Sequence, residues 1–307
     1  MIQNLNPAAN MFLADVSQVQ NEINQLTNEV SSGLKISQPS DDPGDLVTLM
    51  QTRTALDVNS QTSNNLAQVL GNTQVAEQAL QTASQLMSQA LSLGTEGAST
   101  TVTASQRTAI AQQVSGILEQ LVGLANTQSG TQYIFSGDQP QSASYALDPA
   151  SPTGVDALLA NPAATQQIAD PTGVTFSVSL TAQQIFDDRN PDQTPAADNV
   201  FAAVNSLLVS LQANDQTGIT NAINSLQTAS DYLNTQLAFY GSVQDRIQNS
   251  QTFASQQNVQ LQTQLGQIQD ADIAQVAVQL TQDQTQLQAA LTAQSQLPRT
   301  SLFNFLA

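Results

Sequence analysis

The chain of 307 residues contains no cysteine and no histidine. These two absences exclude zinc sites of the usual type, cysteine nucleophiles, serine-histidine-aspartate triads and disulfide bonds. A chain without thiols also suits a protein that passes from a reducing into an oxidising compartment, because no thiol can mispair on the way. We therefore predict that the protein is not an enzyme and needs no cofactor or metal ion.

Basic residues are scarce, with 6 Lys and Arg against 24 Asp and Glu, and the formal net charge is -18. The basic residues lie singly along the chain: Lys35, Arg53, Arg107, Arg189, Arg246 and Arg299. Because no cluster can neutralise several phosphates, we expect neither nucleic acid nor an anionic membrane as a partner. Most of the polar surface comes instead from uncharged Gln, Asn, Ser and Thr. These side chains lack long-range repulsion and favour close packing of like subunits.

Long hydrophobic runs are also missing. No stretch approaches the roughly 20 apolar residues that span a bilayer. No basic residue precedes Lys35, and the first residues lack the continuous apolar block of a secretory signal. We expect no cleaved signal peptide, and a protein that leaves the cell would do so by a route that keeps its N-terminus in place.

Apolar heptads are present at both ends of the chain. Near the start, apolar residues recur in steps of four and three at Phe12, Val16, Val19, Ile23, Leu26 and Val30. Near the end, the heptad pattern includes Ile273, Val276, Leu280, Leu287, Ala290 and Leu291. Each pattern predicts a helix with one apolar seam, which must be covered by another helix of the chain or of a neighbouring subunit. We interpret both seams, with the tail residues Leu302, Phe303, Phe305 and Leu306, as an assembly interface.

The first helix is expected over residues 6–32, ending at Gly33, and a loop follows it. The loop contains the motif Pro39, Ser40, Asp41, Asp42 and Pro43. Asp41 or Asp42 is expected to cap the next helix, with Pro43 as its first residue. Acidic side chains at a helix start interact well with free N–H groups, so we interpret this cluster with Asp45 as capping rather than as a catalytic or metal site.

The central sequence alternates between helical and proline-rich stretches. Helices are expected over residues 45–94 and 104–128, and helical periodicity resumes with Phe201, Val204, Leu208, Ile219, Ile223, Leu226, Leu233, Leu237 and Tyr240. Residues 130–195 hold seven of the 11 prolines, with strand-like patterns at 132–136 and 174–180. The predicted fold is mainly α: a long antiparallel helical rod or coiled coil formed by the N- and C-terminal halves, with a small inserted β-rich domain.

This reading divides the chain into five segments. Residues 1–44 form an N-terminal assembly helix and loop, and residues 45–130 form one half of the rod. Residues 131–198 form the inserted outer domain, 199–260 the second half of the rod, and 261–307 a C-terminal assembly helix. For the central helices we expect the apolar stripes to form an intramolecular core.

Several short motifs carry a resemblance to a known family. They are Ser32-Gly33-Leu34-Lys35 with Pro39-Ser40-Asp41-Asp42-Pro43, Leu124-Ala125-Asn126-Thr127 with Tyr133-Ile134-Phe135-Ser136-Gly137, Ile185-Phe186-Asp187, Asp270-Ala271-Asp272-Ile273-Ala274, and Leu302-Phe303-Asn304-Phe305-Leu306. In this order and spacing they resemble the flagellins and hook-associated proteins. The loop form from Pro39 to Pro43 resembles, within that superfamily, the hook-filament junction proteins (hook-associated protein 3).

The resemblance implies a structural protein of the bacterial flagellum. Members of the family are exported unfolded through the flagellar type III channel, with an uncleaved N-terminal signal and a cytosolic chaperone on the C-terminal segment. They form a homo-oligomeric ring between the first hook-associated protein and flagellin, outside the cell. Three alternatives stay open: a minor flagellin, a coiled-coil scaffold without a flagellar role, and an enzyme.

Overall fold

The computed structural model describes residues 7–160 and 162–296. Its helices are α1 (Pro7–Ser32), α2 (Leu46–Gly97), α3 (Ala104–Ala125), α4 (Ala182–Phe186), α5 (Val200–Gln212), α6 (Gln216–Gln269) and α7 (Ile273–Gln296). Its strands are β1 (Gln128–Ser129), β2 (Gln132–Tyr133), β3 (Tyr145–Leu147), β4 (Val155–Ala157), β5 (Gln167–Ala169) and β6 (Thr175–Ser177). The described part of the chain is therefore mainly helical, as predicted, and none of its helices combines the length and apolarity needed to cross a membrane.

The chain divides into two compact units. We call described residues 7–58 and 257–296 the terminal unit, and Asn59–Gln256 the central unit. Helices α2 and α6 contribute residues to both units. The five segments expected from the sequence are a finer division, and their boundaries stay a prediction.

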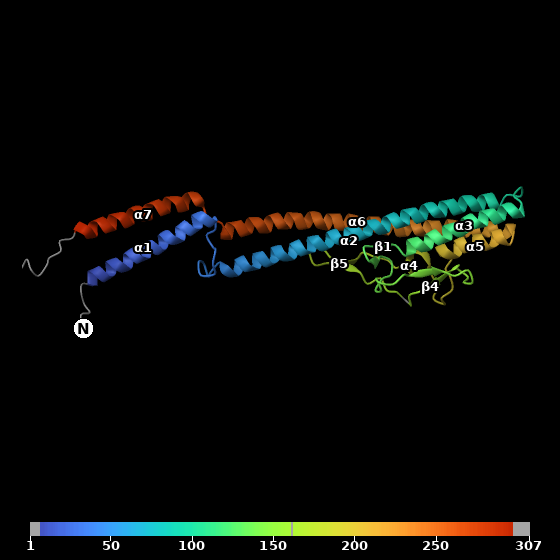
Figure 1. The fold of residues 1–307 in the computed structure, drawn as a ribbon, viewed down its shortest axis with the longest axis horizontal. Coiled ribbons are helices and arrows are strands. Elements are labelled where there is room, and N and C mark those ends of the chain that lie inside the picture. The colour runs from blue at the N-terminus through green and yellow to red at the C-terminus, as the bar shows by residue number, and fades with distance from the viewer. Residues whose placement is uncertain (1–6, 161, 297–307) are drawn as a thin grey trace, which may run out of the picture. The chain divides into compact units, whose positions relative to one another are not determined.

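In the central unit, α2 and α6 run antiparallel. The Asn59 side chain donates to the carbonyl of Ala254, at 2.8 Å, and Gln244 donates to Glu77, at 2.7 Å. Just past the end of α2, the carbonyl of Ala98 accepts from Gln216 at the start of α6, so residues later in α2 pair with residues earlier in α6. Figure 1 shows α3 and α5 beside this pair, and these two helices contact each other. The predicted antiparallel coiled coil is confirmed.

The hydrophobic core lies in the central unit. The larger cluster of buried side chains joins α2, α3, α5 and α6, and a smaller one joins Leu66, Ile168, Phe176, Val178, Val243 and Ile247. Leu66, Leu80, Met87, Val114 and Leu121 lie on the apolar stripes of α2 and α3, and each is 0% exposed. The apolar stripes of these central helices therefore form an intramolecular core, as expected. Each fully buried leucine stabilises the fold by about 1.5–3 kcal/mol relative to an exposed one.

Arg107 links three segments at the end of the helix bundle where α2 ends and α6 begins. Although it is on α3, its buried guanidinium donates to the carbonyls of Gly97 and Ser99, at 2.8 and 3.0 Å, and to the side chain of Asn214, at 2.6 Å. One side chain thereby links the end of α2, the loop that follows it and the connection between α5 and α6. The planar fork of an arginine suits such divergent acceptors.

The proline-rich stretch forms a lobe of three antiparallel strand pairs, β1 with β2, β3 with β4, and β5 with β6. The strands are shorter than the sequence predicted, two and three residues instead of five and seven. Pairing stops because backbone groups beyond the strands bond elsewhere: the N–H of Leu180 donates to the Tyr240 hydroxyl and that of Ala182 to the carbonyl of Phe135. Phe135 and Tyr145 belong to the larger helical cluster, so the lobe shares its core with the helices.

Asn126 explains why α3 ends at Ala125 rather than at the predicted Gln128. Its side chain donates to the carbonyl of Tyr145, at 2.7 Å, and accepts from the N–H groups of Ser144 and Tyr145, at 2.8 and 3.1 Å. The residue therefore fixes the start of the lobe instead of extending the helix. An asparagine that bonds backbone groups in this way competes with helix formation.

Candidate assembly surface of the terminal unit

Helix α1 has one side of reduced exposure. The apolar side chains on it are half-buried: Phe12, Val16, Val19, Ile23 and Leu26. Helix α7 lies beside α1 and contacts it, as Figure 1 shows, so this side faces α7. The predicted seam is present along α1, but its side chains are covered only in part. Val30, the sixth residue of the pattern, is 38% exposed.

The facing side of α7 carries five residues in steps of four and three: Val276, Leu280, Asp283, Leu287 and Ala290. Of the apolar members, Val276 is buried, and Leu280 and Leu287 are half-buried. Asp283 is 5% exposed, and its carboxylate accepts from the Gln279 side chain at 3.5 Å. An ionisable residue thus interrupts the apolar seam, and the apolar heptad pattern of the sequence does not include it because its side chain is charged.

Two residues assigned to the α7 seam from the sequence lie off it. Ile273 is 43% exposed and Leu291 is 49% exposed, although both belong to α7. The tail residues assigned to the interface, Leu302, Phe303, Phe305 and Leu306, lie outside the described residues. Their part in assembly stays a prediction.

Backbone hydrogen bonds join the segment that follows α1 to the segment that precedes α7. The N–H of Lys35 donates to the carbonyl of Gln269, at 2.7 Å, and the N–H of Ala271 donates to the carbonyl of Gly33, at 2.9 Å. Gly33 has a φ of +74°, the left-handed conformation expected where α1 ends. Ile36, 1% exposed, anchors the loop next to this bridge. The bridge fixes α1 and α7 as an antiparallel pair.

The loop motif is built around two aspartates with different roles. Asp42 accepts from the N–H groups of Gly44 and Asp45, at 3.1 and 3.2 Å, which is the cap geometry expected before Pro43. Regular α-helix nevertheless begins three residues after Pro43, at Leu46. Asp41 instead accepts from the N–H groups of Ser37 and Gln38 within the loop.

These hydrogen bonds favour the charged form of both carboxylates. The Gln38 N–H, followed by the Ser37 N–H, holds the pKa of Asp41 below its usual value. For Asp42 the N–H of Asp45 and then the Lys35 ammonium, 3.2 Å away, lower the pKa. Pro39, Ser40 and Pro43 are exposed. The motif therefore acts as a structured, charged loop, and no group of metal-ligating side chains occurs in the described parts of the chain.

Large apolar side chains also lie exposed on the outside of the terminal unit. On α1, Met11 is 68% exposed, and on α7, Val278 is 65% exposed. The start of α2 adds Val47, Met50 and Val58, which are exposed as well. Sequence reasoning missed this second set because its members lie out of phase with the seams. Val47, Met50 and Val58 lie together on one side of α2, and an exposed apolar patch of this kind often marks an interaction site.

Comparison with known protein families identifies the helices at both ends. The model of the bacterial flagellin N-terminal helical region matches residues 3–139, and that of the bacterial flagellin C-terminal helical region matches residues 220–306. Together they cover well over half of the chain. The chain belongs to the flagellin superfamily. It is a structural component of the bacterial flagellum.

Solved structures similar to this flagellin-superfamily chain include flagellar proteins of low sequence identity. A protein from Vibrio parahaemolyticus, provisionally named a flagellar hook-associated protein, is 17% identical, with a TM-score of 0.64 over 75% of this chain and 100% of its own. FlgL from Xanthomonas campestris is 17% identical, with a TM-score of 0.54 over 71% of this chain and 99% of its own. The flagellar junction protein FlgL from Legionella pneumophila is 12% identical, with a TM-score of 0.54 over 66% and 99%. These likenesses establish the fold. No curated protein is similar enough in sequence to count as a relative.

Proposed function

We propose that this chain is a junction subunit of the flagellum, which links the hook, through the first hook-associated protein, to the flagellin filament. Flagellin-superfamily membership and the fold shared with the junction protein of Legionella pneumophila support this role. The loop form from Pro39 to Pro43 favours a junction protein over a minor flagellin. In this role the protein acts by packing, and no step of chemistry is required of it.

The observation that carries the proposal is the contrast between the two units. Both hydrophobic clusters of the described residues lie in the central unit, whereas α1 and α7 leave their seam half-buried. Ordering the backbone costs roughly 1–2 kcal/mol per residue, and two helices that cover each other only in part recover little of it. Neighbouring subunits would bury the remaining apolar surface and supply the missing stabilisation.

The same proposal assigns roles to the rest of the terminal unit. The seam residues of α1 and α7, with the tail from Leu302 to Leu306, would pack between copies in a homo-oligomeric ring. Before assembly, a cytosolic chaperone would cover the C-terminal segment, and export would proceed through the type III channel without cleavage of the N-terminus. The exposed Val278 on α7 gives this segment apolar surface that a chaperone can shield.

Deletion of the gene tests the junction role. We expect hooks to remain on the cells, seen by electron microscopy, while flagellin is shed into the medium, because filaments lose their anchor. A strain that keeps attached filaments would support a minor flagellin instead. An unchanged flagellum would support a scaffold elsewhere in the cell.

A charge placed in the seam tests the assembly role. Leu280→Asp should give a soluble monomer that fails to restore filaments in the deletion strain, because an unpaired carboxylate would be buried between helices. Gln282→Asp is the matched control, since it adds the same charge at an exposed position of α7. Normal assembly of the Leu280 variant would contradict the proposed interface.

A further inference from the structure

The central unit contains a groove that the proposed assembly role does not use. It lies between α2 and the segment around β5 and has a volume of about 470 Å³, within the roughly 300–1,000 Å³ typical of small-molecule sites. Six carboxamide side chains line it: Asn65, Gln68, Asn72, Gln132, Gln166 and Gln167. We call it the amide groove. No charged side chain of the described residues lines it.

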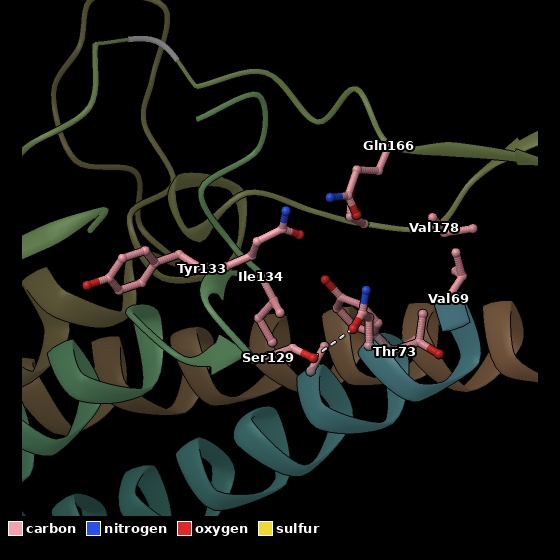
Figure 2. A pocket seen from close by; sticks show the side chains of 12 residues that line it. Val69, Thr73, Ser129, Tyr133, Ile134, Gln166 and Val178 are labelled. Carbon is pink, nitrogen blue, oxygen red and sulfur yellow. Dashed lines mark hydrogen bonds between the residues drawn. The ribbon is translucent and has the colours of Figure 1, made fainter. Parts of the chain in front are cut away.

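A small cavity adjoins the amide groove and shares five lining residues with it: Val69, Asn72, Gln132, Gln166 and Val178. Figure 2 shows Gln166 and Val178 on one side of this cavity, opposite Val69 and Thr73 of α2. Its volume is about 20 Å³, and roughly 10–15 Å³ holds one water molecule. The cavity therefore has room for a single hydroxyl group or water.

The hydroxyl of Ser179 borders this cavity and lacks a partner. Ser179 is 6% exposed, and its Oγ is one of two buried side-chain polar atoms of the described residues without a hydrogen bond. Tyr240, 1% exposed, borders the same cavity, and its hydroxyl accepts from the N–H of Leu180 at 3.2 Å. A buried polar atom without a partner has lost its hydrogen bonds to water and made none in return, so it costs more free energy than an ordinary hydrogen bond contributes. A polar group that enters the cavity and forms a hydrogen bond with the Ser179 hydroxyl would remove this cost.

The lining determines what can bind. A carboxamide can both donate and accept hydrogen bonds, and so can a hydroxyl group. A row of carboxamides therefore matches a molecule rich in hydroxyls. Val69, Ile168 and Val178 add apolar surface for the C–H faces of a sugar ring. An anion would lack a cation in the groove and would meet a chain of net charge -18.

We propose that the amide groove binds a neutral saccharide, with one sugar hydroxyl entering the small cavity to bond with Ser179. A peptide is less well matched, because the groove offers no charged partner and its deep end accommodates one hydroxyl rather than a side chain. The site would let the lobe hold a surface glycan while the terminal unit serves assembly.

The test uses the full-length chain and three neutral probes, maltotriose, cellotriose and chitotriose, followed by saturation-transfer NMR and calorimetry. We expect at least one to bind with a dissociation constant on the order of 1 mM, since exposed neutral hydrogen bonds contribute modestly. Gln68→Leu and Gln166→Leu should each weaken binding about three- to tenfold. Both residues are exposed, so the fold should be retained. The matched control is Gln74→Leu, an exposed position on the same helix outside the groove.

Ser179→Ala tests the deep end. It should weaken binding of the same saccharide about three- to tenfold, whereas Ser177→Ala, an exposed neighbour outside the groove, should leave it unchanged. The proposal is overturned if none of the three saccharides binds, or if binding is the same in the groove variants. It is also overturned if a neutral serine-glycine hexapeptide binds more tightly than every saccharide, or if a crystal soaked with the saccharides shows water alone beside Ser179.

Discussion

Replacement of Leu80 by alanine should destabilise the central unit strongly. Leu80 is 0% exposed and lies in the larger hydrophobic cluster. Removal of a buried leucine side chain costs about 3–5 kcal/mol, because the lost apolar contacts are compounded by the cavity left behind. For a unit of this size, that loss lowers the midpoint of thermal unfolding by about 6–20 °C.

The matched change in the terminal unit is Leu280→Ala. Leu280 is only half-buried, so its truncation removes less apolar area and leaves no closed cavity. We expect a loss of about 1 kcal/mol or less within the terminal unit of the isolated chain. Filament attachment should suffer more, because Leu280 would be covered fully only in the assembly.

Tyrosine fluorescence separates the two effects. The four tyrosines, Tyr133, Tyr145, Tyr232 and Tyr240, all lie in the central unit, and the chain has no tryptophan. The tyrosine signal therefore reports unfolding of the central unit, while far-ultraviolet circular dichroism reports all helices. Leu80→Ala should shift the tyrosine transition and Leu280→Ala should not. If both variants shift it equally, the two units unfold as one and the reasoning from separate cores is wrong.

Three further predictions follow from individual contacts. In denaturant unfolding, Gly154→Ala should lower the stability by about 2–5 kcal/mol and Gly173→Ala by about 1–2 kcal/mol. Both glycines have a positive φ, but of the two only Gly154 would bring a new Cβ within 3 Å of Leu118. Arg107→Lys should cost about 1.5–3 kcal/mol by the same assay, because a single ammonium cannot reach all three acceptors. The pKa of Asp41 is lowered in the fold, so its carboxylate stabilises the loop at pH values above the ordinary pKa of 3.8, and this stabilisation is lost as the pH falls through the lowered pKa. NMR titration of the loop amides should show this loss at the lowered pKa. A titration of Asp41 at its ordinary pKa would contradict the prediction.

The central helices could be predicted from the sequence because their stabilisation is periodic and local. Leu66, Leu80 and Met87 recur at heptad spacing, and such a pattern fixes both the helix and the side that it buries. The bend at Gly33 was equally readable, since a glycine at a helix end accepts positive φ.

The lobe and the details of the terminal unit could not be read in the same way. Helix α3 ends where the long-range hydrogen bonds of Asn126 begin, and strand pairing after β6 stops before Leu180, whose N–H donates to the Tyr240 hydroxyl. No local sequence pattern indicates such distant partners. Asp283 lies on the α7 seam, seven residues after Val276, but an apolar heptad pattern does not include a charged residue. The amide groove depends on residues far apart in sequence, so only the folded chain brings them together.

Amide hydrogen exchange along α1 and α7 tests the central claim most directly. It should be measured in the isolated full-length chain and in flagella that contain the protein, with α3 as an internal reference. We expect fast exchange in α1 and α7 of the isolated chain, slow exchange in α3, and protection of all three helices in the flagellum, because neighbouring copies would complete the burial of the terminal seams. Equal protection of α1, α7 and α3 in the isolated chain, or continued fast exchange of α1 and α7 in the flagellum, would contradict the account.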